Sequence, residues 1–588
     1  MKSRHAAVIF ACIALCSLVP CLGAQDVEET VSLMAKIRAA WSPSFSPDGG
    51  RLAFVSDLNG VPQIWVVDSG GGWPRLVTGL DDQVGGVSWS PDGEWLSFSL
   101  APGGGMNTQV YLVRPDGTDL RRLTDGGAEN NWLGGWSHDG RLLAISSNRG
   151  GASSMDAYAY DTQTGELLEI AENPGIGVLA DLSRDDRRAV LWRMESRSDD
   201  NLFLLDLEDR SESLLTPHEG PGSFGGGRFS PDGSAVYISS NADRDLIGFA
   251  WVEIGEGGEI GPIDYLATRD DAELSAFANT EDGRTAALVW NVAGRSELQF
   301  IDLESLDRSY GPELPAEIAG GLVFSRDGRL LAMTLSGSAA PTDIWILDRD
   351  AGTLNQITHS PHAGIALDAL VRPELVYFEA ADGLQLSGWL YRPENASGPA
   401  PYVINFHGGP EGQERPRFRS DYQALLAAGI GVLAPNVRGS AGFGKRFVNL
   451  DNGELRYGAI EDIASCVSYL VDNGIADPDR IGIAGGSYGG YMTMAGLAWY
   501  PELFAAGANL FGVVNFETFF RNTEPWMAAI STVEYGDPDS QAELLRDLSP
   551  IHKVDRVQAP TIVLHGANDT NVRVVEADEG HDFRKMEN

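Results

Sequence analysis

The stretch Arg480-Ile-Gly-Ile-Ala-Gly-Gly-Ser-Tyr-Gly-Gly-Tyr-Met492 decides the fold of the second half of the chain. Its apolar residues 481–484 lie between Asp-Pro-Asp and a group of glycines, which is typical of a buried strand. The residues that follow favour a helix over 491–500. Gly485 to Gly489 therefore fits the pattern G-x-S-x-G in a strand–turn–helix setting, where a strained turn presents the hydroxyl of Ser487.

The pentapeptide alone is weak support for a reactive serine. A chain with 70 glycines among 588 residues is expected to hold roughly one such string by chance. An ordinary glycine-rich turn fits the five residues equally well, so the surrounding sequence has to decide between the two.

The surrounding sequence alternates strands and helices. We expect a hairpin over 377–391, and then a series of strands and helices over 402–406, 422–428, 431–435, 459–473, 480–484, 491–500, 505–510 and 561–565. Strands that alternate with helices at this spacing predict a doubly wound, mostly parallel sheet. Ligand sites in such folds lie at the carboxyl ends of the strands, where Ser487 is placed.

The first half of the chain is a repeat array. An aromatic or apolar residue, Ser, a variable residue, Asp and Gly recur before a short strand, with the Asp 44 to 50 residues apart. A period of this length with about four short strands is typical of a propeller blade. Seven copies predict a seven-bladed β-propeller over 25–365, followed by an α/β-hydrolase domain over 366–588. The repeated residues are Asp48, Asp92, Asp139, Asp185, Asp232, Asp282 and Asp327.

The repeated aspartates are expected to be turn residues and not metal ligands, since each belongs to a different blade. His138, which replaces the proline of its repeat, is expected to be an exposed turn residue. The sequence predicts no metal site and no cofactor.

The first 24 residues resemble a secretory signal peptide. Lys2 and Arg4 precede an apolar run over 6–19, which is too short and wrongly flanked for a transmembrane helix. We expect cleavage after Ala24 and an exported, periplasmic or secreted, protein. The mature chain would keep one cysteine, Cys466, which we expect in the core.

The composition excludes some partners. The formal charge is −40, from 83 acidic and 43 basic residues, which argues against nucleic acid and against anionic membranes.

Further motifs follow other strands. His407-Gly-Gly-Pro410 can present a backbone N–H to an oxyanion, as a second donor beside the N–H of Tyr488. Arg438, in a glycine-rich loop, is expected to form an internal ion pair. His565-Gly-Ala-Asn-Asp569 follows a strand, where a hydrolase has its acid, and Asp578-Glu-Gly-His-Asp-Phe583 holds a later histidine. The order Ser, Asp, His is the hydrolase order.

Taken together, these motifs resemble the prolyl oligopeptidase family of serine peptidases, in the branch with acylaminoacyl-peptidases and dipeptidyl-peptidase-like enzymes. The resemblance covers nearly the whole mature chain. It implies Ser487 as nucleophile, His581 as base and Asp569 as the acid that orients it, with the oxyanion held by the N–H groups of Gly409 and Tyr488. It also implies short peptide substrates, because the propeller covers the site.

The substrate pocket and the exact activity stay open. The resemblance implies that Val572 lines the pocket for the residue before the scissile bond. Phe519 and Trp526, in an aromatic stretch with Phe516 and Phe520, fit either that pocket or the core. The sequence does not distinguish between exopeptidase, endopeptidase, esterase and acyl-peptide hydrolase activities. The alternative that is not an enzyme is a propeller binding protein with an inactive hydrolase domain. Family members often associate, so a homo-oligomer is also open.

The end of the chain departs from the family pattern. Asp569 and His581 are 12 positions apart, whereas the helix and strand that normally separate them need about 20 residues. We therefore expect a hydrolase domain that lacks a C-terminal strand and helix, with one sheet edge open and apolar surface exposed. Such a chain would have impaired stability and doubtful activity.

Overall fold

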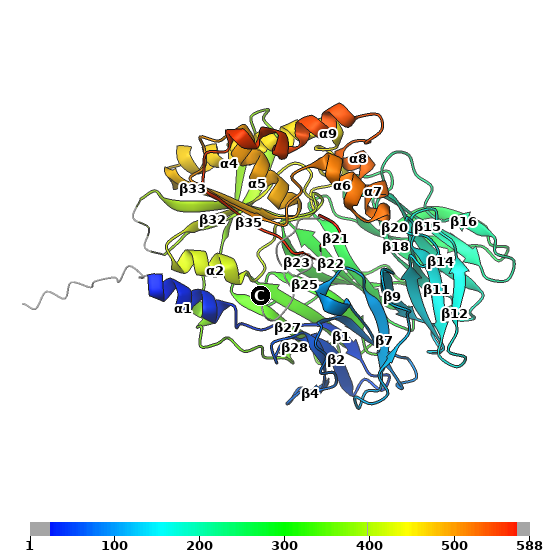
Figure 1. Ribbon diagram of the computed structural model, residues 1–588. Helices are drawn as coiled ribbons and strands as arrows, with labels where there is room; N and C mark the ends of the chain where they lie inside the picture. The colour runs from blue at the N-terminus through cyan, green and yellow to red at the C-terminus, as the bar shows by residue number, and fades with distance from the viewer. Residues whose placement is uncertain (1–23, 395, 397, 568, 573–588) are drawn as a thin grey trace, which may run out of the picture.

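The protein is described from a computed structural model that covers residues 24–394, 396, 398–567 and 569–572. In Figure 1 the propeller fills the lower right and the hydrolase domain the upper left. His581 and residues 1–23, which include most of the predicted signal peptide, lie outside the described residues. No helix within the described ranges is long and apolar enough to cross a membrane.

Seven antiparallel four-stranded sheets form the propeller, as the repeat predicts. The first three blades are β1 Ala40–Phe45, β2 Arg51–Ser56, β3 Gln63–Asp68, β4 Arg75–Leu76; β5 Val84–Trp89, β6 Leu96–Leu100, β7 Gln109–Val113, β8 Arg121–Arg122; and β9 Asn131–Trp136, β10 Leu142–Ser147, β11 Asp156–Asp161, β12 Leu167–Ala171. The other four are β13 Ile176–Leu182, β14 Arg188–Ser196, β15 Asp199–Asp206, β16 Glu212–Leu214; β17 Phe224–Phe229, β18 Ala235–Ser240, β19 Gly248–Ile254, β20 Ile260–Ala267; β21 Glu273–Asn279, β22 Thr285–Val292, β23 Arg295–Asp302, β24 Arg308–Tyr310; and β25 Ile318–Phe324, β26 Leu330–Gly337, β27 Ala340–Asp348, β28 Thr353–Gln356.

The repeated Ser-x-Asp-Gly segment is the turn between the first two strands of a blade. In the first blade Ser46 Oγ donates to Asp48 Oδ1 at 2.5 Å, and the amide of Gly50 donates to the same oxygen at 3.0 Å. The same serine–aspartate pair recurs at Ser90 and Asp92. The aspartates are therefore turn residues, as predicted.

The ring closes without exchange of strands between blades. Each sheet is built from four consecutive strands, and the first and seventh blades meet through a shared apolar cluster that includes Phe54, Trp65 and Ile344. Closure therefore rests mainly on buried apolar area.

The hydrolase sheet has seven strands in the order β29-β30-β32-β31-β33-β34-β35. In this order the pairs from β32 through β35 are parallel, whereas β30 pairs antiparallel with both β29 and β32. This confirms the predicted doubly wound, mostly parallel sheet. The strands are β29 Glu374–Glu379, β30 Gln385–Tyr391, β31 Ala400–Phe406, β32 Gly431–Asn436, β33 Ala476–Gly486, β34 Ala506–Leu510 and β35 Thr561–Leu564.

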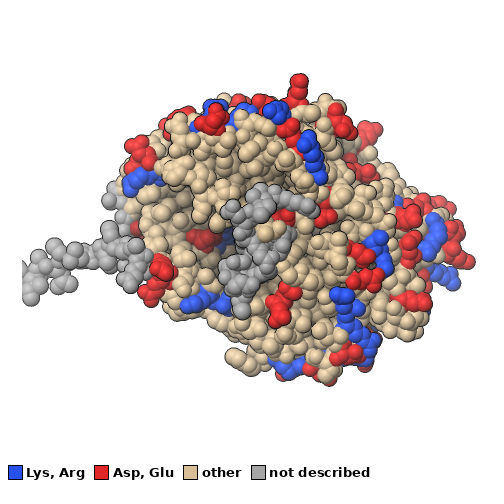
Figure 2. Space-filling view, viewed as in Figure 1, with Lys and Arg blue, Asp and Glu red and all other residues tan. Residues whose placement is uncertain are grey.

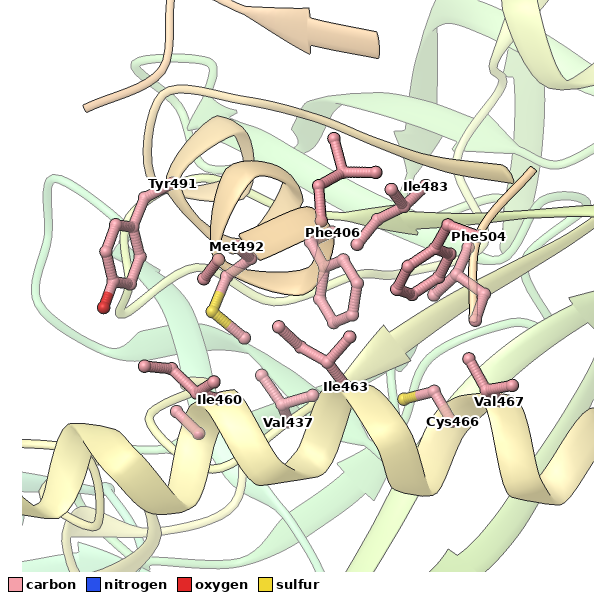
Figure 3. Close-up of a cluster of buried hydrophobic side chains, with 14 of the residues drawn as sticks. Phe406, Val437, Ile460, Ile463, Cys466, Val467, Ile483, Tyr491, Met492 and Phe504 are labelled. Atoms are coloured by element: carbon pink, nitrogen blue, oxygen red, sulfur yellow. The ribbon is translucent and has the colours of Figure 1, made fainter. Parts of the chain in front are cut away.

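Helices cover this sheet, and α4 and α5 enclose the largest apolar cluster. Figure 3 shows Ile460 and Ile463 of α4 facing Met492 of α5, and Cys466 farther along α4, toward Phe504. Cys466 is buried in this core, as expected. The helices are α1 Ala24–Met34, α2 Ser420–Ala427, α3 Lys445–Val448, α4 Arg456–Asp472, α5 Tyr488–Trp499, α6 Phe516–Asn522, α7 Pro525–Ile530, α8 Thr532–Tyr535 and α9 Ala542–Leu548.

The N-terminal helix α1 lies beside α2 of the hydrolase domain and outside the blades (Figure 1). The range predicted for the propeller, 25–365, thus contains a segment that packs on the other domain. The first blade begins at Ala40.

The sheet ends at β35 within the described residues. Ile562, Val563 and Leu564 are 55%, 57% and 44% exposed, whereas Ile481 and Ile483 of β33 are buried. Successive side chains of a strand point to opposite faces, so the described residues leave both faces of β35 exposed. This agrees with the open apolar edge expected from the sequence.

Candidate active site

Ser487 occupies the turn between β33 and α5 with a left-handed backbone. Its φ is 55° and its ψ is −118°, a conformation that costs an L-residue energy and is concentrated at functional sites. The amide of Ser487 donates to the carbonyl of Leu510 on β34 at 3.0 Å, and its carbonyl accepts from the amide of Tyr491 at 3.1 Å. The strained turn is therefore held at both ends.

Two glycines of the G-x-S-x-G pattern are required by close backbone contact. A Cβ on Gly485 would lie 2.5 Å from the carbonyl carbon of Gly489, and a Cβ on Gly489 would lie 2.1 Å from the carbonyl oxygen of Phe406. Both separations are shorter than van der Waals contact allows. The pattern is thus explained by the elbow, and the reading of an ordinary serine turn loses its support.

The loop His407–Pro410 lies directly beside the serine. A Cβ on Gly408 would be 3.5 Å from Cβ of Ser487. His407 fixes this loop, since its Nε2 is 2.9 Å from Oγ of Ser440 and its Nδ1 is 2.9 Å from the carbonyl oxygen of Gly408. Burial lowers the pKa of His407, which keeps the ring neutral and in a structural role.

The two predicted oxyanion donors belong to segments that adjoin Ser487. Gly409 follows Gly408 in the adjoining loop and has a φ of 129°, which favours glycine. Tyr488 is the first residue of α5, where a backbone N–H has no partner within the helix. One N–H group thus belongs to the loop beside the serine and the other to the residue that follows it, as stabilisation of an oxyanion requires.

A buried ion network lies under the start of α5. The hydroxyl of Tyr488 donates to Oδ2 of Asp451 at 3.2 Å, and Asp451 pairs with Arg456 at 2.8 Å. The Arg456 guanidinium also pairs with Glu534, and all three charged side chains are buried. Burial raises the pKa of both Asp451 and Glu534.

The propeller reaches this region through Arg197, in the turn between β14 and β15. Its Nη1 is 3.4 Å from Oε2 of Glu411, and its Nε donates to Oγ of Ser531 at 3.2 Å. Glu411 follows directly after the His407–Pro410 loop. Sequence reasoning missed the contact of Arg197, because no motif marks a charge that is paired across domains. It also missed the network within the hydrolase domain, because no motif marks the pairing of Arg456 with the distant Glu534.

Asp569 is buried after β35, in a loop that orients its carboxylate. Its Oδ1 accepts from the amides of Asn571 and Val572 at 2.9 and 3.0 Å. Its Oδ2 is 3.3 Å from Nε2 of His565, which also contacts the carbonyl of Val572. Within the described residues, His565 is thus the histidine that lies against Asp569.

The predicted pocket residues lie in packed surroundings. Val572 is half-buried against the hydrolase core, and Phe519 is buried in that core, with its ring centroid 5.8 Å from that of Tyr535. Trp526 is buried against the propeller and meets Trp132 edge-on, with centroids 5.6 Å apart. Phe519 therefore contributes to the core, and Trp526 to the contact between the domains.

Two other sequence interpretations were tested by the structure. Arg438 pairs with Asp462 at 2.8 Å and with Asp382 at 3.0 Å, so the internal ion pair is confirmed. His138 is 38% exposed in its turn, as expected, but its Nε2 also lies 3.7 Å from Oε1 of Glu281, which was not foreseen.

Comparison with known proteins agrees with this geometry. Residues 416–581 match the prolyl oligopeptidase family, and residues 22–249 match the TolB beta propeller domain. The chain therefore carries a peptidase domain of the prolyl oligopeptidase family of serine peptidases.

Relatives of this serine peptidase include dipeptidyl aminopeptidase BIII of Pseudoxanthomonas mexicana, which is 26% identical over 91% of this chain and 79% of its own length. Dipeptidyl peptidase family member 6 of Caenorhabditis elegans is 24% identical over 92% of this chain and 78% of its own length. The crystal structure of puromycin hydrolase has the same fold, with a TM-score of 0.80 at 19% identity, over 95% of this chain and 93% of that one.

Proposed function

We propose that the protein is an exported peptidase that hydrolyses short oligopeptides through an acyl-enzyme formed on Ser487. His581 acts as general base and Asp569 orients it. The observation that carries the proposal is the strained backbone of Ser487, beside a loop that holds Gly409. Backbone strain of this kind persists only where the surrounding structure imposes it, and it is concentrated at active sites, which agrees with a reactive hydroxyl at Ser487.

The proposed chemistry follows from what a serine hydroxyl needs. The imidazole of His581 takes the proton as Oγ of Ser487 attacks the scissile carbonyl, and the N–H groups of Gly409 and Tyr488 stabilise the oxyanion. The imidazolium then gives its proton to the leaving amine, and water hydrolyses the acyl-enzyme by the reverse transfers. Asp569 stabilises the imidazolium and fixes its tautomer.

Short peptides are the substrates that the architecture favours. The contacts of Arg197 and Trp526 hold the propeller against the hydrolase domain near the serine, so a folded protein has little room to enter. Two relatives carry dipeptidyl peptidase names, which supports a peptide substrate. We assign Val572 to the wall of the pocket for the residue before the scissile bond.

Export is proposed from the N-terminal sequence alone. Lys2 and Arg4 before an apolar run, with small residues near Ala24, give the pattern of a cleaved secretory peptide. N-terminal sequencing of protein from a secreting host is the test, and a mature chain that begins near residue 25 is expected.

The proposed activity is tested by hydrolysis of Ala-Pro-, acetyl-Ala- and benzyloxycarbonyl-Gly-Pro-nitroanilides, with Ser487→Ala as control. We expect turnover that the control loses, and the preferred compound separates dipeptide release, acyl-peptide hydrolysis and internal cleavage. An acetyl-ester included in the panel separates an esterase. No turnover from folded protein would contradict the proposal.

An inactive hydrolase domain beside a binding propeller is the second candidate. The uncovered faces of β35 favour it, since the strand that carries Asp569 has less support than β33. Labelling of Ser487 by a fluorophosphonate separates the two, because the serine reacts only where the base and the oxyanion donors are assembled.

A further inference from the structure

One position of the propeller repeat is not explained by the turn or by the peptidase site. The variable residue of Ser-x-Asp-Gly makes none of the serine–aspartate hydrogen bonds of the turn. In all seven blades it lines one cavity of about 530 Å³. These seven residues are Pro47, Pro91, His138, Arg184, Pro231, Glu281 and Arg326.

This cavity lies at the end of the propeller away from the hydrolase domain. Its lining turns join the first and second strands of each blade, whereas the hairpins between second and third strands contact the hydrolase domain. Arg197 of one such hairpin pairs with Glu411, and Asn291 of another donates to Gln413 at 2.7 Å. The second strand separates the two ends, so the cavity is distinct from the Ser487 site.

The cavity carries an excess of positive charge in a protein with a net charge of −40. Three arginines line it against two carboxylates: Arg184, Arg228 and Arg326, with Asp181 and Glu281. Arg184 of the fourth blade and Arg326 of the seventh both contact Glu281 of the sixth, so their guanidinium groups approach the same part of the rim.

The guanidinium groups are incompletely paired. Arg326 Nε lies 3.4 Å from Glu281, and Arg228 Nη1 lies 3.6 Å from Asp181, both long for charged hydrogen bonds. Among the described residues no carboxylate lies within ion-pair distance of Arg184, whose side chain contacts the backbone carbonyl of Glu281. The rim thus retains donors for an anionic ligand.

The wall of the cavity also holds buried polar atoms that lack a protein partner within the described chain. Both side-chain atoms of Asn279, Nδ2 and Oδ1, are in this state, and so is Nε1 of Trp136. An amide that can donate and accept matches a peptide bond, and buried polar groups are normally satisfied. Phe229, Phe277 and Phe324 add apolar surface beside them.

We propose that this cavity, called here the distal site, binds a short peptide through a carboxylate. Arg184 and Arg326 would take the carboxylate, because a guanidinium donates two parallel hydrogen bonds to it. Asn279 and Trp136 would bond the adjoining peptide group, and the aromatic walls would contact a side chain. A volume of about 530 Å³ is within the range of small-ligand pockets and suits a few residues.

The test measures binding to the Ser487→Ala protein, so that it does not depend on hydrolysis. The probe is acetyl-tetraalanine with a free carboxylate, compared by calorimetry with its C-terminal amide. We expect at least 10-fold weaker binding of the amide, and an equal loss for the acid in Arg184→Gln/Arg326→Gln. Arg284→Gln is the matched control, since Arg284 is in the sixth-blade turn with 81% exposure and does not line the cavity.

A benzophenone-labelled form of the same peptide acid locates the complex. The proposal is supported if the labelled acid forms adducts on residues of the distal site and the labelled amide does not. An amidated peptide with one glutamate tells whether a side-chain carboxylate serves as well as the terminal one. Equal binding of acid and amide, adducts confined to the hydrolase domain, or displacement by acetate at the peptide's own concentration would overturn it.

Discussion

The strands that precede Ser487 and Asp569 differ greatly in how well they are packed. Ser487 follows β33, whose Ile481 and Ile483 are buried between helices, and its turn is fixed by glycines in close backbone contact. Asp569 follows β35, whose Val563 is 57% exposed. Figure 2 shows acidic and basic side chains scattered over both domains on the viewed face.

A recognisable sequence motif therefore does not imply that the strand carrying it is well packed. Ser487, the proposed nucleophile, is positioned by the core of the sheet. Asp569, the proposed acid, is positioned by its own loop, through two backbone amides and His565. Changes near Ser487 should therefore act on chemistry or on global stability, whereas changes on β35 should leave the fold intact.

The largest effect is expected from Ser487→Ala. Removal of the nucleophile should lower kcat/KM by roughly 10⁵-fold or more, as when one member of a catalytic triad is lost. Exposed Ser540→Ala is the control and should keep full activity. Retention of even a tenth of the activity in Ser487→Ala would show that another group carries the reaction.

Asp569→Asn is expected to lower kcat by about 10⁴-fold, because an amide holds the imidazole in the wrong tautomer. His565→Gln should cost far less, since His565 only helps to place the carboxylate, whereas His581→Gln should match Ser487→Ala. Steady-state rates of the three variants measure this. A reversed order for the two histidines would make His565 the base.

Arg456→Met tests the buried network beneath α5. It leaves Asp451 and Glu534 buried without their cation, and the free energy of unfolding should fall by about 3–5 kcal/mol. Urea denaturation gives the value, with exposed Arg446→Met as the control. A change below 1 kcal/mol in Arg456→Met would mean that the carboxyls are neutral and need no cation.

The smallest effect is expected on β35, and a pair of truncations compares this strand directly with β33. Ile483→Ala on β33 should lower the free energy of unfolding by roughly 2–5 kcal/mol, whereas Val563→Ala on β35 should change it by less than about 0.5 kcal/mol. Thermal and urea unfolding of both variants measure the difference. Equal losses would show that β35 is covered in solution.

Much of the architecture could be predicted because it repeats or alternates. The Asp-Gly turns identified seven blades, and the alternation of strands and helices identified the parallel sheet. Ser487 was found because its glycines are required by contacts with Phe406 and Gly489, a local requirement that leaves a trace in the sequence.

The contacts that the sequence did not reveal join residues far apart in the chain. Arg197 meets Glu411 across the domains, and His138 meets Glu281 across the propeller end. Neither residue has a motif, and either could have been solvated. The pairing of Asp569 with His565 was missed for another reason, since the motif was interpreted as a marker of the acid alone.

The most direct test of the account is the rate at which a fluorophosphonate labels Ser487, followed by intact-mass analysis. We predict one adduct per chain on wild-type protein, located at Ser487, and a loss of labelling of roughly 10³-fold or more in His581→Gln. His565→Gln should still be labelled. Wild-type protein that is folded but unlabelled, or equal labelling of His581→Gln, would contradict the assembled triad.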